Sequence, residues 1–243
     1  MKNNSTIRDT PTAGNDTDIH TPCTLSKKLL LFELEQSFTH DVLKPILTYA
    51  ADSVHGGFIT SMASNWQYID ENANKYIVTQ SRYTYIAALG ASFYPQNTAF
   101  CTAARAGFRF LHEHMWDKHC GGFFYTVTRS GRVVDTRKRA YGHAFAILAC
   151  ATCYNVLKEK SMRDMAIAAL EYLENVFHDS KYGGYFTWAD NSGTLIDVEA
   201  FIKDQNCTLH LIEAFTALYR IASDMPLVRE RLEECITLMI DRI

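Results

Sequence analysis

Three chargeable side chains recur at matching places in this chain of 243 residues. Arg82, His143 and His210 follow the second glycine of a Gly-Gly pair by 25, 21 and 26 residues, respectively. Arginine carries a permanent positive charge, and histidine can take up or release a proton near neutral pH. Because a repeat that places such a group at one equivalent position builds a common site, we expect the three side chains to converge.

The glycine pairs belong to a repeated phrase in which Gly-Gly is followed by aromatic residues. Its copies begin at Gly56, Gly121 and Gly183, so they are 65 and 62 residues apart. A period of this length indicates supersecondary units that stack on their neighbours. Alternating aromatic and polar residues and a turn signal follow the phrase, and two helical segments come next. The predicted unit is therefore a short β-hairpin, a first helix and a second helix.

The two helices of each predicted unit differ in polarity. The first is rich in alanine, leucine and aromatic residues, whereas the second carries charge along one side, as at Glu171, Glu174 and Arg229. A helix that is apolar all round is buried, and a helix with a polar stripe lies at the surface. The sequence thus predicts an all-α fold, an α/α toroid of about seven helices with short β-hairpins on one rim.

The inner helices are expected near residues 75–93, 137–157 and 204–222, around a central cavity of the kind that holds a ligand. Arg82, His143 and His210 should lie on their concave side. A first helix is expected over about residues 24–51, with a broad apolar stripe that includes Leu29 and Phe32.

Composition narrows the class of partner. The net charge is −3, the isoelectric point is near 6.3 and no basic block stands out, which argues against nucleic acid. Charged residues are expected to interrupt every apolar run before the roughly 18–20 residues of a membrane span, so no membrane is expected. Residues 1–24 lack an apolar signal core and read as a disordered leader, and we expect a cytoplasmic protein.

Metal and redox chemistry are not expected. Cys150 and Cys153 form a C-x-x-C inside an apolar helix without a second pair, which indicates buried thiols in a reducing compartment. His112 and His114 are two residues apart on a predicted helix, so they do not face each other. We predict no bound metal.

Three motifs resemble, in order, those of the N-acylglucosamine 2-epimerase superfamily, which includes cellobiose 2-epimerases and mannose and sulfoquinovose isomerases. They are Gly-Gly-Phe with Lys75 and Gln80-Ser81-Arg82, the segment 135–148 (DTRKRAYGHAFAIL) and the segment 206–214 (NCTLHLIEA). The resemblance covers about residues 30–243. It implies an (α/α)6 barrel, in agreement with the toroid predicted from the repeat.

The resemblance also implies a reaction, cofactor-independent proton transfer at C2 of a mono- or disaccharide (epimerisation) or between C1 and C2 (isomerisation). A histidine supplies the base and an arginine stabilises the enediolate oxygens. By position, His210 matches the first active-site histidine of the family, Glu213 lies one helical turn further on, and Arg82 matches a substrate-binding arginine. The candidate catalytic residues are therefore His210 and Glu213, and the candidate substrate-binding residues are Arg82, His143, Tyr141, Trp66 and Trp188. For His143 and the three aromatic residues, plain packing is the alternative.

The sequence also departs from the family pattern. Members of the family continue through further repeats that carry a Gly-His-x-x-Glu motif and a last histidine, the principal acid–base pair, and neither segment occurs here. Residues 25–243 are thus expected to form an incomplete barrel, truncated after about the first half to two-thirds. We expect weak or no activity, and aggregation or a homodimer across the open edge.

Two other functions remain open. The first is a non-catalytic carbohydrate-binding or regulatory protein on the same fold, which the missing acid–base pair favours. The second is a glycoside hydrolase, which would need two opposed carboxylates. The acidic candidates at the rim of the cavity form no pairing that supports a hydrolase: Asp117, Asp135, Asp190, Asp204 and Glu213.

Overall fold

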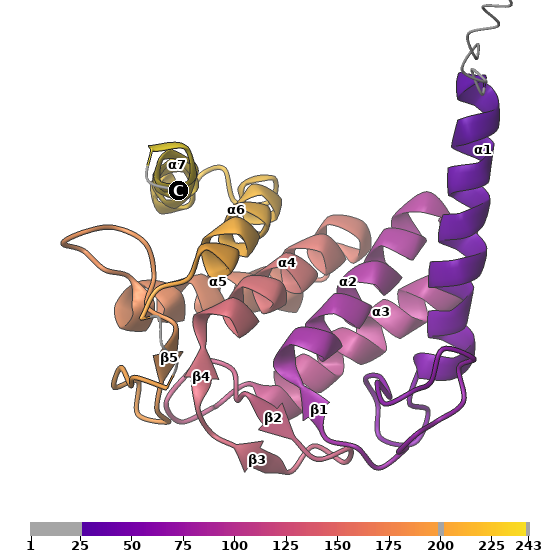
Figure 1. The fold of residues 1–243 in the computed structure, drawn as a ribbon, viewed down its shortest axis with the longest axis horizontal. Coiled ribbons are helices and arrows are strands. Elements are labelled where there is room, and N and C mark those ends of the chain that lie inside the picture. The colour runs from indigo at the N-terminus through magenta and orange to yellow at the C-terminus, as the bar shows by residue number, and fades with distance from the viewer. Residues whose placement is uncertain (1–25, 199–201, 242–243) are drawn as a thin grey trace, which may run out of the picture.

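The computed structural model describes residues 26–198 and 202–241, so the predicted leader, residues 1–24, lies outside the described residues. Seven α-helices dominate this part of the chain (Figure 1), which confirms the predicted all-α class. They are α1 (Lys27–Ser37), α2 (Ile77–Phe93), α3 (Thr98–Phe110), α4 (Ala140–Leu157), α5 (Lys160–Tyr172), α6 (Gln205–Tyr219) and α7 (Pro226–Asp241).

The helices form two layers in an open arc. The inner helices α2, α4 and α6 pack in that order, α2 against α4 and α4 against α6, and each packs against the outer helix that follows it. The observed inner ranges agree with the predicted 75–93, 137–157 and 204–222. α2 and α6 lie on either side of α4, towards the two ends of this arc.

The central inner helix α4 is largely buried. Its 18 residues include no Asp, Glu, Lys or Arg, and 67% of this stretch is buried inside the protein. The expectation that charge interrupts every apolar run of this length is therefore wrong for Ala140–Leu157. By length and composition this helix could cross a membrane, but the core helix of a globular domain passes the same test. Its packing against α2, α5 and α6 identifies it as a core helix.

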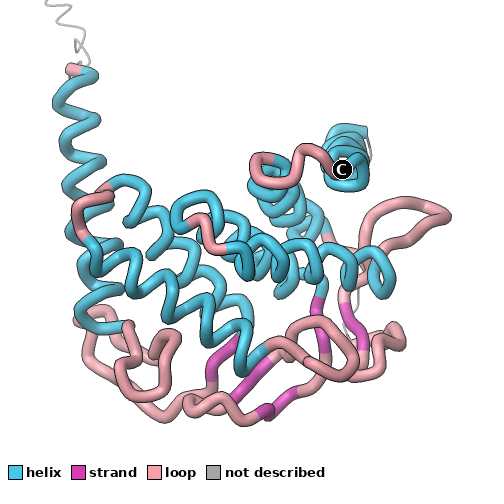
Figure 2. Tube along the Cα trace, turned by 180° about the vertical axis from the view of Figure 1, so that it is seen from behind, coloured by secondary structure: helices cyan, strands magenta, loops and turns pink. Residues whose placement is uncertain are grey.

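Short strands gather at the end of the arc where the inner helices begin (Figures 1 and 2). β1 (Lys75–Tyr76) pairs with β2 (Thr126–Val127), β2 pairs with β3 (Val133–Asp135), and β4 (Lys138–Arg139) pairs with β5 (Trp188–Ala189), all antiparallel. The pairs β1–β2 and β4–β5 join one unit to the next. The strands thus fix the rim from which the inner helices start.

Each Gly-Gly pair forms the same tight loop on this rim. All six glycines have φ between 65° and 76°, a region that suits a residue without Cβ. An aspartate five residues before the second glycine accepts hydrogen bonds from two loop N–H groups and pairs with a lysine near the next inner helix. The three pairs are Asp52–Lys75, Asp117–Lys138 and Asp179–Lys203.

The first predicted helix is correct in extent but only partly in burial. α1 continues through two π-helical segments, η1 (Phe38–Leu43) and η2 (Ile46–Ala50). Leu43 and Ile46 are buried, whereas α1 itself has no buried residue and extends beyond the other helices. The apolar stripe therefore reaches the core only near its C-terminal end, and Leu29 and Phe32 are 45% and 57% exposed.

Candidate functional site

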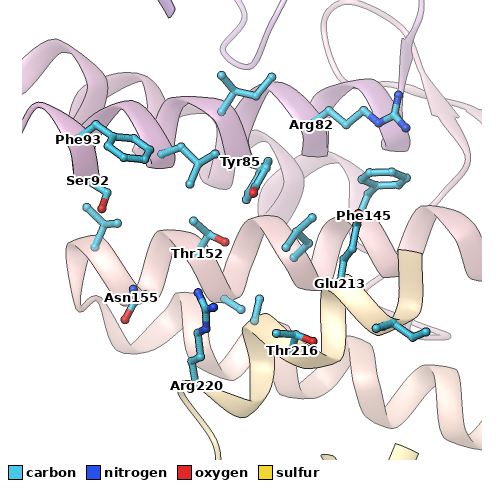
Figure 3. A pocket seen from close by; sticks show the side chains of 17 residues that line it. Arg82, Tyr85, Ser92, Phe93, Phe145, Thr152, Asn155, Glu213, Thr216 and Arg220 are labelled. Atoms are coloured by element: carbon cyan, nitrogen blue, oxygen red, sulfur yellow. The ribbon is translucent and has the colours of Figure 1, made fainter. Parts of the chain in front are cut away.

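A groove of about 830 Å³ runs along the concave side of the arc (Figure 3). Residues of α2, α4 and α6 line it, so the three inner helices together build the site. At its rim end lie Arg82 from α2, Phe145 from α4 and Glu213 from α6. This is the central cavity that the repeat predicted.

Arg82 lies on the concave side, as expected. Its guanidinium lies over the ring of Phe145, 4.3 Å from the centroid, and Nη2 donates a hydrogen bond of 3.4 Å to the hydroxyl of Tyr141. Cation–π contact orients the side chain without neutralising its charge. Among the described residues no carboxylate forms an ion pair with Arg82, so its charge is open to a ligand.

His210 and Glu213 form a hydrogen-bonded pair on α6. Nδ1 of His210 is 2.8 Å from Oε2 of Glu213, one helical turn away, and the side chains are 17% and 50% exposed. The imidazole packs against Phe145, with 4.5 Å between the centroids, and against the edge of Tyr141. When Glu213 accepts the Nδ1 proton, Nε2 carries the lone pair of a base, and it has no hydrogen-bond partner among the described residues.

Tyr141 lies between Arg82 and the His210–Glu213 pair. It is half-buried in the first turn of α4, and it contacts Arg82 on one side and His210 on the other. The guanidinium of Arg139 lies 5.2 Å from its ring centroid. The structure therefore brings four of the candidate residues together around Phe145: Arg82, Tyr141, His210 and Glu213.

His143 does not point into the groove. It is fully buried, Nε2 accepts a hydrogen bond from the backbone N–H of Phe123 (2.9 Å), and Nδ1 donates to the carbonyl of Arg139 (2.8 Å). Burial lowers the pKa of His143 to about 4, which keeps it neutral. The expectation that it faces the cavity is wrong, because its imidazole holds the second Gly-Gly loop as Gln80 holds the first.

Neither tryptophan candidate lines the groove. Trp66 stacks on Tyr49 of η2, with 5.9 Å between the ring centroids. Trp188 is 4% exposed, and the guanidinium groups of Arg137 and Arg139 each lie over its ring at 5.1 Å. In this structure their rings are used in packing. The aromatic residues that line the groove are instead Tyr85, Phe93 and Phe145, none of which the sequence singled out as a candidate.

The described part of the chain holds no cluster of three or more His, Cys, Asp or Glu side chains that could bind a metal ion. Cys150 and Cys153 are buried in α4, and burial raises the pKa of Cys150 to about 12. A thiol in this state is a poor nucleophile and a poor metal ligand. The charged groups that line the groove are therefore Arg82, Glu213 and Arg220. The imidazole of His210 lies beside this lining, hydrogen-bonded to Glu213.

Comparison with known proteins places this geometry in context. The family model described as N-acylglucosamine 2-epimerase (GlcNAc 2-epimerase) matches residues 57–243. A cellobiose 2-epimerase of Eubacterium cellulosolvens is 32% identical over 183 residues, which cover 72% of this chain and 44% of the relative. The structure of cellobiose 2-epimerase from Spirochaeta thermophila superimposes with a TM-score of 0.82 at 28% identity, over 91% of this chain and 56% of that one.

This chain therefore spans about half the length of the relatives that it matches. A mannosidase of glycoside hydrolase family 76 from Bacteroides thetaiotaomicron also superimposes, with a TM-score of 0.65 over 89% of this chain and 55% of that one. Its sequence identity is 15%, so this likeness concerns the fold alone.

Proposed function

The chain belongs to the N-acylglucosamine 2-epimerase family, and on this premise we propose that its groove binds a mono- or disaccharide and removes the proton from C2. The observation that carries the proposal is the convergence of Arg82 with the His210–Glu213 pair around Phe145. A base and a fixed cation on facing helices are what enolisation of a sugar requires.

In the proposed step, Nε2 of His210 takes the C2 proton of the open-chain sugar. The electron pair of the C2–H bond forms the C1–C2 double bond, and the carbonyl electrons move to O1 of the enediolate. Arg82 stabilises this oxygen, with Tyr141 placed beside it. Glu213 stabilises the imidazolium through the 2.8 Å contact with Nδ1. All of these groups are side chains, so the step needs no cofactor.

Net epimerisation is limited by the return of a proton to the opposite face of C2. Epimerisation needs a second acid on that face, and the groove lining includes no imidazole, with His210 held beside it by Glu213. A positioned acid or base contributes about 10²- to 10⁴-fold to the rate. We therefore propose slow proton exchange at C2 and little net epimerisation by these 243 residues.

A non-catalytic carbohydrate-binding role is the alternative. It uses the same groove, with Arg82 and Tyr141 as hydrogen-bond donors to sugar hydroxyls. Glycoside hydrolysis is disfavoured, because the groove lining includes a single carboxylate, Glu213, and hydrolysis uses two. A cytoplasmic location remains part of the proposal, supported by the six free cysteines of the described residues.

The test is deuterium exchange in heavy water with mannose, N-acetylmannosamine and cellobiose, followed by loss of the C2 proton signal. We expect slow exchange for at least one of the three sugars. Saturable binding without exchange of any sugar would support the binding role instead. Absence of both binding and exchange for all three would contradict the proposal.

A further inference from the structure

The far end of the groove carries a second polar cluster that proton transfer at C2 does not use. Figure 3 shows Arg220 extending from the end of α6 into the groove, where Thr152 and Asn155 of α4 and Thr216 of α6 lie. Arg220 is ten residues beyond His210, a rise of about 15 Å along a helix. A sugar ring with its C2 atom at His210 does not reach Arg220.

The charge of Arg220 is not neutralised within the described residues. No ion pair or hydrogen bond engages its guanidinium there, and the single carboxylate of the groove lining, Glu213, is bonded to His210. The lining thus holds two arginines and one glutamate, although the chain as a whole has a net charge of −3. A local surplus of positive charge in a concave surface concentrates anions.

The hydroxyl of Tyr85, which also lines the groove, lies within the electrostatic reach of Arg220. Burial raises the pKa of the Tyr85 hydroxyl, Glu213 raises it further, and Arg220 opposes both effects. Arg220 and Glu213 therefore both lie close enough to influence one hydroxyl on the opposite helix α2. The polar residues around Arg220 and those around Glu213 and Arg82 therefore line one continuous groove rather than two separate surfaces.

We propose that the far end binds an oxyanionic group of an extended saccharide whose reducing end lies at His210. Arg220 supplies two parallel N–H donors that match a carboxylate, sulfate or phosphate. Thr152, Thr216 and Asn155 supply hydroxyl and amide donors beside it. The substrate class is an acidic disaccharide or longer chain, and this assignment rests on the function proposed above.

Calorimetric titration at low salt with cellobiose, cellobiuronic acid and inorganic phosphate tests the assignment. The two disaccharides differ only in the carboxylate at C6 of the non-reducing ring. We expect the acidic disaccharide to bind about 10- to 100-fold more tightly than cellobiose, since the difference is one charge-assisted contact. Arg220→Gln should remove that difference. Arg109→Gln, which removes an exposed arginine on the outer helix α3, should preserve it.

The outcomes separate this assignment from the proposed function. Equal binding of both disaccharides, unchanged in Arg220→Gln, would overturn the anion subsite and leave sugar binding intact. Phosphate binding that needs Arg220, with no binding of either disaccharide, would overturn the saccharide assignment and the proposed function together. Matched thermal unfolding of the wild type, Arg220→Gln and Arg109→Gln shows that each folds, so a lost preference reports on the groove.

Discussion

His143 and His210 have opposite environments, although both follow a Gly-Gly pair in the sequence. His210 lies at the groove with Glu213 on Nδ1, whereas both nitrogens of His143 are bound to backbone groups. Spacing could not separate the two, because the inner helices begin at slightly different distances from their loops. His143 occupies the place of Gln80, and two residues later Phe145 takes the place of Arg82.

At the residue scale, His143→Gln should remove one source of acid sensitivity. The folded pKa of His143 is about 4, below the ordinary value of 6.5. The unfolded chain therefore binds a proton that the folded chain does not, and the free energy of unfolding falls as the pH drops from about 6.5 towards 4, by at most about 3 kcal/mol. Glutamine at this position can still accept from Phe123, as Gln80 accepts from Phe58.

Urea unfolding at pH 7 and at pH 4.5 measures this effect. The wild type should lose more stability between the two pH values than His143→Gln does. The carboxylates titrate equally in both proteins, so the difference isolates His143. An equal loss in both would contradict the lowered pKa, because His143 would then bind its proton equally in the folded and unfolded chains.

At the scale of elements, the rim loops depend on aspartate–lysine pairs that the sequence analysis missed. Lys75, Lys138 and Lys203 were visible within or beside the family motifs, but their partners lie 21 to 24 residues earlier, at Asp52, Asp117 and Asp179. A charged residue in a sequence is more often solvated than buried, and only the fold shows that Lys75 and Lys138 are about 1% and 0% exposed.

Breaking one of these buried pairs should be costly. Asp117→Asn keeps an acceptor for the loop N–H groups and leaves Lys138 buried and uncompensated, so we expect a loss of about 3–5 kcal/mol in unfolding free energy. The matched change Asp164→Asn removes an exposed partner of Lys160 and should cost less than about 1 kcal/mol. Similar urea midpoints for the two variants would contradict the structural role of the pair.

For the whole molecule, the repeat was enough to predict the architecture. The period of 65 and 62 residues and the contrast in polarity within each unit gave the two layers and the ranges of α2, α4 and α6. The direction of a side chain and the partner of a helix face depend on tertiary packing. The sequence therefore did not reveal that His143, Trp66 and Trp188 pack away from the groove, or that α1 has no buried residue.

The open arc should self-associate. Leu30, Leu31 and Leu34 of α1 are 46%, 56% and 58% exposed, and their three- and four-residue spacing places them on one face of the helix, where contiguous apolar surface promotes association. We propose a homodimer across the open edge, seen by light scattering at micromolar concentration. Leu31→Glu combined with Leu34→Glu should yield a monomer, whereas Lys28→Glu on the same exposed helix should not. A wild-type chain that remains monomeric throughout would contradict this prediction.

Deuterium incorporation at C2 of cellobiose is the direct test of His210 as the base, because it reports proton removal even without net turnover. We expect incorporation that is above the enzyme-free rate, slower than in a full-length epimerase, and reduced at least about 100-fold in His210→Gln. Matched thermal unfolding of wild type and variant shows that the fold is retained. Incorporation that persists undiminished in His210→Gln, or none above background in the wild type, would contradict the assignment of His210 as the base.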